Sequence, residues 1–110
     1  MTLPLRPRPR RYPLIAQVEV TDLQSSARLN QVISDLSPFG CHISTRQMWP
    51  IGSTVTISIA HNGKTFLADA KVIYGQPMLG MGIVFTHIEP MHQETLDAWI
   101  AELKGSMKKP

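Results

Sequence analysis

Two short clusters of polar residues carry the side chains best suited to chemistry in this chain of 110 residues. The first is an N-terminal run rich in proline and arginine, with arginines at Arg6, Arg8, Arg10 and Arg11. A guanidinium presents a planar fork of donors that can hold an oxyanion through two hydrogen bonds or stack on an aromatic face. The second cluster is Asp-Leu-Ser-Pro-Phe-Gly at residues 35–40, in which a carboxylate and a hydroxyl lie two positions apart in a turn-forming sequence.

Charge is distributed unevenly along the chain. Residues 1–11 hold four arginines and no acidic residue, and residues 104–110 hold three lysines. Residues 12–103, in contrast, hold eight acidic residues and four basic ones. A basic face that follows a long polyanion is therefore not expected, whereas an arginine arm suits the capture of one compact anion. We accordingly predict no nucleic acid partner.

The other reactive side chains form no catalytic or metal-binding pattern. Of the four histidines only His42 adjoins a cysteine, Cys41, and neighbouring strand residues point to opposite faces of a sheet. The sequence has no nucleophile elbow and no glycine loop that would cradle a phosphate. We therefore predict that the protein is not an enzyme and uses no metal and no cofactor.

The sequence also bears on the compartment. A single cysteine makes no internal disulfide, so nothing indicates an oxidising environment. No stretch approaches the roughly 18 apolar residues of a membrane span, and the N-terminus lacks the apolar core of a signal peptide. We expect a cytoplasmic protein without membrane insertion.

Apolar periodicity predicts an all-β fold with one C-terminal helix. Alternation between turn sequences predicts six strands, over residues 14–21, 27–34, 41–45, 54–59, 65–74 and 79–86. Asn62-Gly63 predicts a type I′ hairpin, whose two central positions need positive φ. An apolar stripe at Leu96, Trp99, Ile100 and Leu103 predicts a helix that begins near Pro90 and stops at Gly105. We divide the chain into an arm (1–13), a barrel with its helix (14–104) and a basic tail (105–110).

The two polar clusters, in this order, resemble the motifs of the PilZ domain family. That family has an Arg-x-x-x-Arg motif just before its first strand and an Asp/Asn-x-Ser-x-x-Gly motif between later strands. Arg6 and Arg10 have the first spacing, and Asp35, Ser37 and Gly40 match the second. The resemblance covers nearly the whole chain, including the strand count, a Gly-x-x-Phe near the end of the last strand and the closing helix. It implies a six-stranded antiparallel β-barrel with the helix covering one end.

The same resemblance implies binding of cyclic di-GMP, an anionic bacterial second messenger with two phosphates and two guanines. Arginines of the arm would hold a phosphate or a guanine edge. Asp35 would accept hydrogen bonds from guanine, Ser37 would add a hydroxyl, and Gly40 would permit positive φ or a close approach of backbone to base. The ligand-binding residues implied are Arg6, Arg10, Arg11, Asp35, Ser37 and Gly40. The protein would be a stand-alone receptor that signals through a separate protein partner.

Several alternatives stay open at this point. The second arginine of the motif is either Arg10, by its spacing from Arg6, or Arg11, which directly precedes the first strand. The arm can instead be a solvated tail, and the Asp-x-Ser segment an ordinary turn that caps its own backbone. A degenerate PilZ module that contacts proteins without binding nucleotide is the main alternative. A barrel that binds single-stranded nucleic acid is less favoured, because aromatic residues make up only 6% of the chain.

Overall fold

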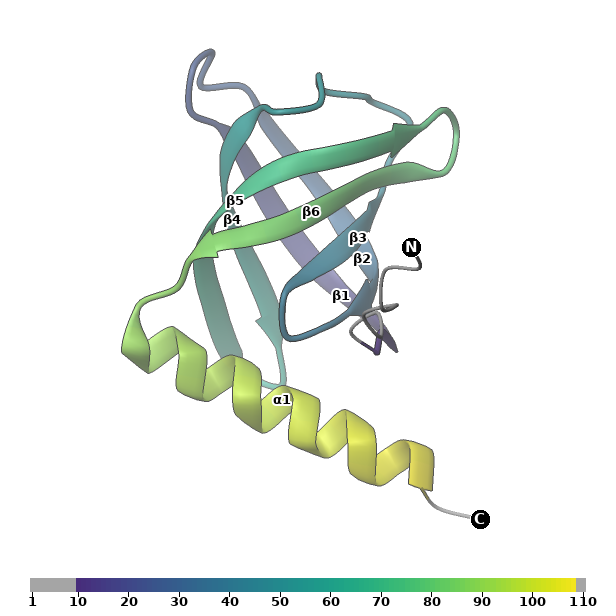
Figure 1. Cartoon of the computed structure of the whole chain (residues 1–110), viewed down its shortest axis with the longest axis vertical. Helices are drawn as coiled ribbons and strands as arrows, with labels where there is room; N and C mark the ends of the chain where they lie inside the picture. The colour runs from purple at the N-terminus through teal and green to yellow at the C-terminus, as the bar shows by residue number, and fades with distance from the viewer. Residues whose placement is uncertain (1–9, 109–110) are drawn as a thin grey trace, which may run out of the picture.

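Six segments of alternating apolar and polar residues pair into a closed antiparallel barrel, and one helix follows them (Figure 1). The computed structural model describes residues 10–108. The elements are β1 (Tyr12–Asp22), β2 (Arg28–Leu36), β3 (Gly40–Ser44), β4 (Thr54–His61), β5 (Lys64–Gln76), β6 (Gly80–His87) and α1 (Pro90–Lys108). The order around the barrel is β1-β2-β3-β6-β5-β4, closed by the pairing of β4 with β1. The predicted fold class is confirmed.

The strand β4 shows how the sequence pattern builds the barrel wall. Val55, Ile57 and Ile59 are buried, while the residues between them are exposed or half-buried. The hairpin that joins β4 to β5 has φ of 52° at Asn62 and 74° at Gly63, which confirms the predicted positive φ at both positions. Such a turn matches the twist of the two strands and sets their register, so that the inward residues of β5 face the same core.

Two β-bulges lie near the start of β1. Opposite β2, the strand β1 carries an extra residue between Pro13 and Ala16. Opposite β3, the strand β2 carries an extra residue between Ile33 and Asp35. A bulge bends its strand and re-aims the side chains beside it. Here both bulges lie at the level of Ser34, next to Asp35, at the part of the wall that holds the candidate site.

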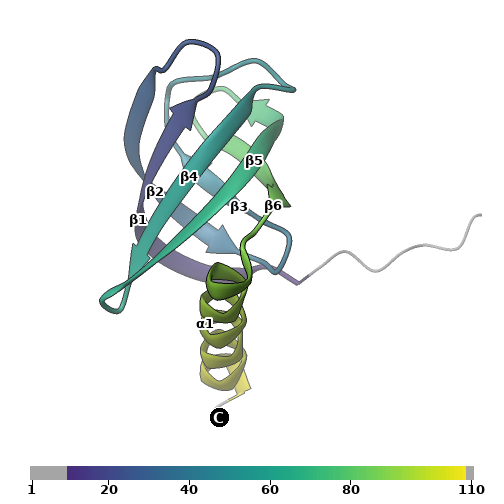
Figure 2. The same cartoon turned by 90° about the vertical axis from the view of Figure 1, so that its left-hand side faces the viewer.

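The helix α1 lies across one end of the barrel, below the strands in Figure 1 and nearly vertical in Figure 2. Leu96, Trp99 and Ile100 are buried, and α1 packs on β5 and β1. Each such side chain contributes about 1.5–3 kcal/mol when fully buried, so the predicted stripe holds the helix to the barrel. Within the described residues, no helix combines the length and the apolar character needed to cross a bilayer.

Most predicted element boundaries differ from the observed ones by a few residues, and two of the differences have a clear physical reason. The strand β1 begins at Tyr12, not at residue 14, because the Tyr12 side chain is buried in the core and pairs in register with Leu36. The helix continues through Gly105 to Lys108, so most of the predicted tail is helical. Glycine in a helix costs only about 1 kcal/mol relative to alanine, and Gly105 does not have the positive φ of a helix-ending glycine.

Candidate ligand-binding groove

Strand pairing places residues from distant parts of the sequence in one row on the outer face of the barrel. Pro13 of β1 is paired with Asp35 of β2, and Asp35 with His42 of β3. His42 is paired in turn with Gly82 of β6, and Gly82 with Tyr74 of β5. The row thus joins the start of β1 to the end of β5, across four strand pairings.

Arg11 directly precedes β1 and reaches over this row. Its Nη1 donates a 3.0 Å hydrogen bond to the hydroxyl of Tyr74 and lies 3.7 Å from Oδ2 of Asp35. The guanidinium carbon is 5.9 Å from the centroid of the Tyr74 ring, within the range of a cation–π contact. The hydrogen bond to Tyr74, followed by the nearby charge of Asp35, raises the pKa of Arg11 against the opposing effect of desolvation. The site therefore holds a permanent cation.

Asp35 is only partly satisfied by its surroundings. Its Oδ1 is buried and has no hydrogen-bond partner in the described part of the chain, while a quarter of the side chain, 25%, stays exposed. A buried carboxylate oxygen without a partner is costly, by about 1–3 kcal/mol or more for a charged group. Among residues 10–108, Asp35 therefore has one carboxylate oxygen whose acceptor capacity is unused.

The turn after β2 is closed by Ser37. Its Oγ accepts hydrogen bonds of 3.1 Å from the backbone N–H groups of both Phe39 and Gly40, and its own N–H donates to the carbonyl of Gly40 at 2.8 Å. Ser37 is buried. Its hydroxyl is thus engaged in the turn, as the self-capping alternative proposed, and it shapes the wall next to Asp35.

The need for glycine at position 40 comes from the protein itself. Gly40 does not have positive φ, and a Cβ there would collide with the carbonyl oxygen of Ile83 in β6. Of the two roles that the sequence suggested for Gly40, positive φ is wrong, whereas a close approach of backbone to a base stays a prediction. Gly40 lets β3 approach β6 closely and so closes the barrel beneath the site.

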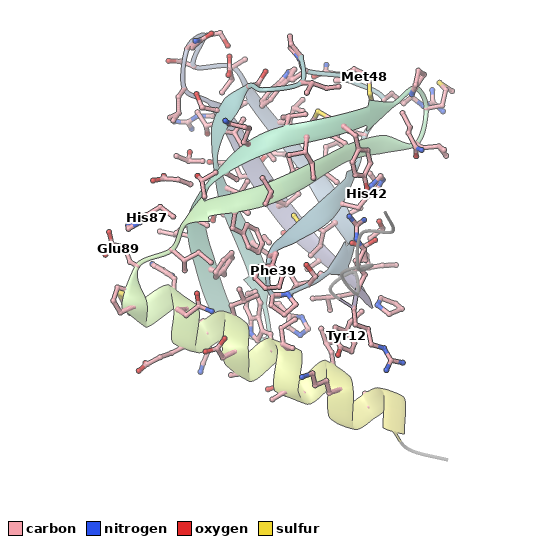
Figure 3. The ribbon with its side chains drawn as sticks, in the orientation of Figure 1. Tyr12, Phe39, His42, Met48, His87 and Glu89 are labelled. Carbon is pink, nitrogen blue, oxygen red and sulfur yellow. The ribbon has the colours of Figure 1, made fainter. Side chains whose placement is uncertain are left out.

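A groove of about 750 Å³ opens beside Arg11. Its lining includes Arg11, Ser37, Phe39, Gly40, His42 and Tyr74. We call it the Arg11 groove. Phe39 is 59% exposed at the tip of the turn and His42 lies on the neighbouring strand (Figure 3). Asp35 is in contact with Arg11 at the edge of the groove and is not part of its lining.

The structure separates the predicted arginines. Arg11 lies with Asp35, Ser37 and Gly40, whereas the Arg10 guanidinium lies 5.8 Å from the centroid of the Tyr12 ring and does not line the groove. Arg6 lies outside the described residues. Of the two candidates for the second arginine of the motif, Arg11 is therefore the one that lies beside Asp35 and lines the groove.

Three residues of the groove with aromatic or imidazole rings were not predicted from the sequence: Phe39, His42 and Tyr74. Phe39 occupies a variable position of the Asp-x-Ser-x-x-Gly motif, so its aromatic type was the available signal. His42 and Tyr74 carry no local signal, since only the pairing of β3 and β5 with β6 brings them together.

Cys41 lies on the inner face beneath His42 and belongs to the core. Burial, with a further effect from Asp35, raises the pKa of this thiol to about 12. The thiol is therefore protonated near neutral pH, when the nucleophilic thiolate is negligible. The interpretation of Cys41 as a small buried strand residue is confirmed.

The comparison with known families agrees with the motifs. A family model described as the PilZ domain matches residues 4–102, so the chain belongs to the PilZ domain family. That range takes in the arginine arm, all six strands and the buried part of α1. No curated protein matches the chain in sequence.

Solved structures of PilZ domains share the fold. The PilZ domain of CeSA from a cellulose-synthesizing bacterium is 20% identical, with a TM-score of 0.69 over 86% of this chain and 98% of that one. The PilZ domain of YcgR from Escherichia coli, solved with c-di-GMP, is 17% identical, with a TM-score of 0.69 over 94% and 95%.

A longer protein is also similar. The inhibitor of motility MotI/DgrA of Bacillus subtilis is 12% identical, with a TM-score of 0.74 over 96% of this chain. The alignment covers 54% of that protein, so this chain spans about half its length. At these identities the likenesses establish the fold.

Proposed function

We propose that this PilZ domain is a receptor for cyclic di-GMP, that it binds the ligand at the Arg11 groove, and that it passes the signal to a separate protein partner. The observation that carries the proposal is the position of Arg11, whose Nη1 lies 3.7 Å from Asp35 Oδ2 at the edge of a groove large enough for a base. A cation and a carboxylate with unused acceptor capacity are the two groups that a guanine nucleotide requires.

The groups present fit the ligand. The fork of Arg11 can hold a phosphate, or O6 and N7 of a guanine. Asp35 can accept from the N1–H and N2–H donors of a guanine. The exposed ring of Phe39 offers a face on which a base can stack. Ser37 and Gly40 act through the turn, by fixing where Asp35 and Phe39 lie.

Magnitudes show that these contacts suffice for a signalling affinity. A micromolar dissociation constant corresponds to about −8 kcal/mol. A hydrogen bond to a charged group contributes roughly 1.5–3 kcal/mol, and a stacked base about 1–3 kcal/mol. Several such contacts together reach the required total, whereas a single arginine does not. Arg6, which lies outside the described residues, is a further candidate for a phosphate contact.

Isothermal titration tests the proposal directly. Cyclic di-GMP is titrated into the full chain, with cyclic di-AMP and GMP as matched ligands. We expect micromolar binding of cyclic di-GMP and at least tenfold weaker binding of both others, about 1.4 kcal/mol each. Absence of heat up to ligand concentrations of about 100 μM, where binding free energies are near −5 to −6 kcal/mol, rejects the proposal and favours a PilZ module that contacts proteins only.

A further inference from the structure

The guanidinium of Arg11 is shared unequally between two neighbours. Its Nη1 makes a hydrogen bond of 3.0 Å to Tyr74, while the distance to Asp35 Oδ2 is 3.7 Å, too long for one. A carboxylate is the stronger acceptor for a guanidinium, and the two prefer a bidentate pairing. The phenol nonetheless holds the nitrogen that is nearest to the carboxylate. Some feature of the wall must therefore keep Tyr74 in place as an acceptor.

A directional chain of hydrogen bonds provides that feature. Nε2 of His42 lies 2.9 Å from the carbonyl oxygen of Leu79, which can only accept, so Nε2 carries the hydrogen. In the neutral imidazole Nδ1 is then an acceptor, and it lies 3.1 Å from the hydroxyl of Tyr74. Tyr74 thus donates its hydrogen to His42 and keeps its oxygen lone pairs for Arg11. The Tyr74 hydroxyl is therefore both a donor, to His42, and an acceptor, from Arg11.

Gly82 lets the Tyr74 ring reach this position. A Cβ at residue 82 would collide with the ring, which therefore lies directly over the backbone of β6. From there the ring crosses from β5 toward His42 on β3, with 5.9 Å between the two ring centroids. The phenol is held by the shape of the wall as well as by its hydrogen bonds.

We propose that Tyr74 is a positioning residue of the Arg11 groove, which keeps Arg11 and Asp35 from closing into a bidentate ion pair. Such a pair would occupy the donor fork and the carboxylate at once, and neither group would be available to a nucleotide. With Nη1 held by Tyr74, Oδ2 of Asp35 makes no hydrogen bond to Arg11, and the buried Oδ1 has no partner within the described part of the chain. This inference rests on the proposed binding of cyclic di-GMP at the groove.

The expected signature is a change in base preference. The Asp35 carboxylate can recognise guanine through N1–H and N2–H, whereas adenine has no hydrogen at N1. When Tyr74→Phe allows Arg11 to pair with Asp35, the affinity for cyclic di-GMP should fall by about tenfold, the equivalent of one lost charged contact. The affinity for cyclic di-AMP should change by less than about twofold, because adenine does not use the Asp35 carboxylate and groups without a shared contact contribute independently. General loss of structure would lower both affinities alike.

A double-mutant cycle separates positioning from packing. Wild type, Tyr74→Phe, Asp35→Asn and the double variant are titrated with both dinucleotides. In the Asp35→Asn background no ion pair can form, so adding Tyr74→Phe should alter cyclic di-GMP affinity by less than about twofold. Tyr12→Phe is the matched control, since it removes a hydroxyl from a tyrosine that does not line the groove, and it should leave the affinity unchanged.

The outcomes keep the two proposals distinct. If the wild type does not bind cyclic di-GMP, the proposed function fails. The Tyr74 inference fails alone if the wild type binds and Tyr74→Phe keeps its affinity and base preference. It also fails if Tyr74→Phe weakens binding equally with and without the Asp35 carboxylate. Thermal denaturation of each variant identifies any that is misfolded, and Tyr74→His, which retains a ring acceptor, should then recover part of the preference.

Discussion

Two grooves on the outer face of the barrel differ above all in the charge of the side chains that line them. The Arg11 groove, of about 750 Å³, has a cation in its lining and no acidic residue. A second groove of about 480 Å³, over β1, β4, β5 and the start of α1, has Glu19, Asp69 and Glu89 in its lining and neither lysine nor arginine. We call it the acidic groove. Figure 3 shows His87 and Glu89 of this groove well apart from His42 of the other.

The grooves also differ in how their polar groups are used. In the acidic groove His87 Nε2 lies 3.1 Å from Glu89 Oε1, and His92 Nδ1 accepts a 3.2 Å hydrogen bond from the N–H of Leu67. At the edge of the Arg11 groove, the carboxylate of Asp35 has one oxygen without a partner among residues 10–108, beside a cation. The Arg11 groove is also the larger of the two, but volume alone does not select a ligand. The placement of one cation and one unsatisfied acceptor distinguishes the groove suited to an anionic guanine nucleotide.

Removing the guanidinium of Arg11 should remove the feature that suits the Arg11 groove to an anionic ligand. Arg11→Ala is expected to weaken cyclic di-GMP binding by about 30-fold, the loss of roughly 2 kcal/mol of charged contact. Arg10→Ala is the matched control, because it removes the adjacent guanidinium, which lies over Tyr12 outside the groove. Its effect should stay below about threefold, as for an exposed charge at a distance. Titration of both variants decides whether Arg10 or Arg11 is the functional second arginine of the motif. A larger loss of affinity in Arg10→Ala than in Arg11→Ala would contradict the structural assignment.

Distorting the wall of the Arg11 groove should lower the stability of the fold. In Gly40→Ala the new Cβ collides with the Ile83 carbonyl, and such overpacking costs about 1–3 kcal/mol. The melting temperature should fall by about 4–8 °C for each kcal/mol. Gly105→Ala is the control, since nothing lies within 4 Å of that position and alanine favours the helix by about 1 kcal/mol. It should raise the melting temperature, and an equal fall in both variants would show that glycine 40 has no special role.

The fold was largely predictable because its signals are local. Alternation at Val55, Ile57 and Ile59 and the Asn-Gly turn are contained within a few residues, and the structure has the predicted strand order and hairpin. The errors lie at boundaries, where local signals compete. Gly105 resembles a stop in sequence, yet a single glycine is a weak barrier to a helix.

The site was predictable only in part, for a physical reason. Arg11 directly precedes β1 and Asp35 lies in β2, which pairs with β1, so two motifs close to these strands suffice to suggest that the residues meet. Tyr74 and His42 meet through β6, which lies between β3 and β5 in the barrel although it follows both in sequence. The bulges around Asp35 set the row, and no residue type in the sequence marks them. Register between distant strands is the information that sequence patterns lack.

The smallest expected effect tests the acidic groove itself. The variant with both Glu19→Gln and Asp69→Asn removes two of its carboxylates while preserving shape and hydrogen-bonding capacity. If cyclic di-GMP binds at the Arg11 groove, titration in physiological salt should show a change below about twofold, because exposed charges beyond a Debye length of about 8 Å are largely screened. At low salt the affinity should rise slightly, since less negative charge then repels the ligand. A fall of tenfold or more, about 1.4 kcal/mol, would instead place the ligand among these carboxylates and reverse the assignment of the two grooves.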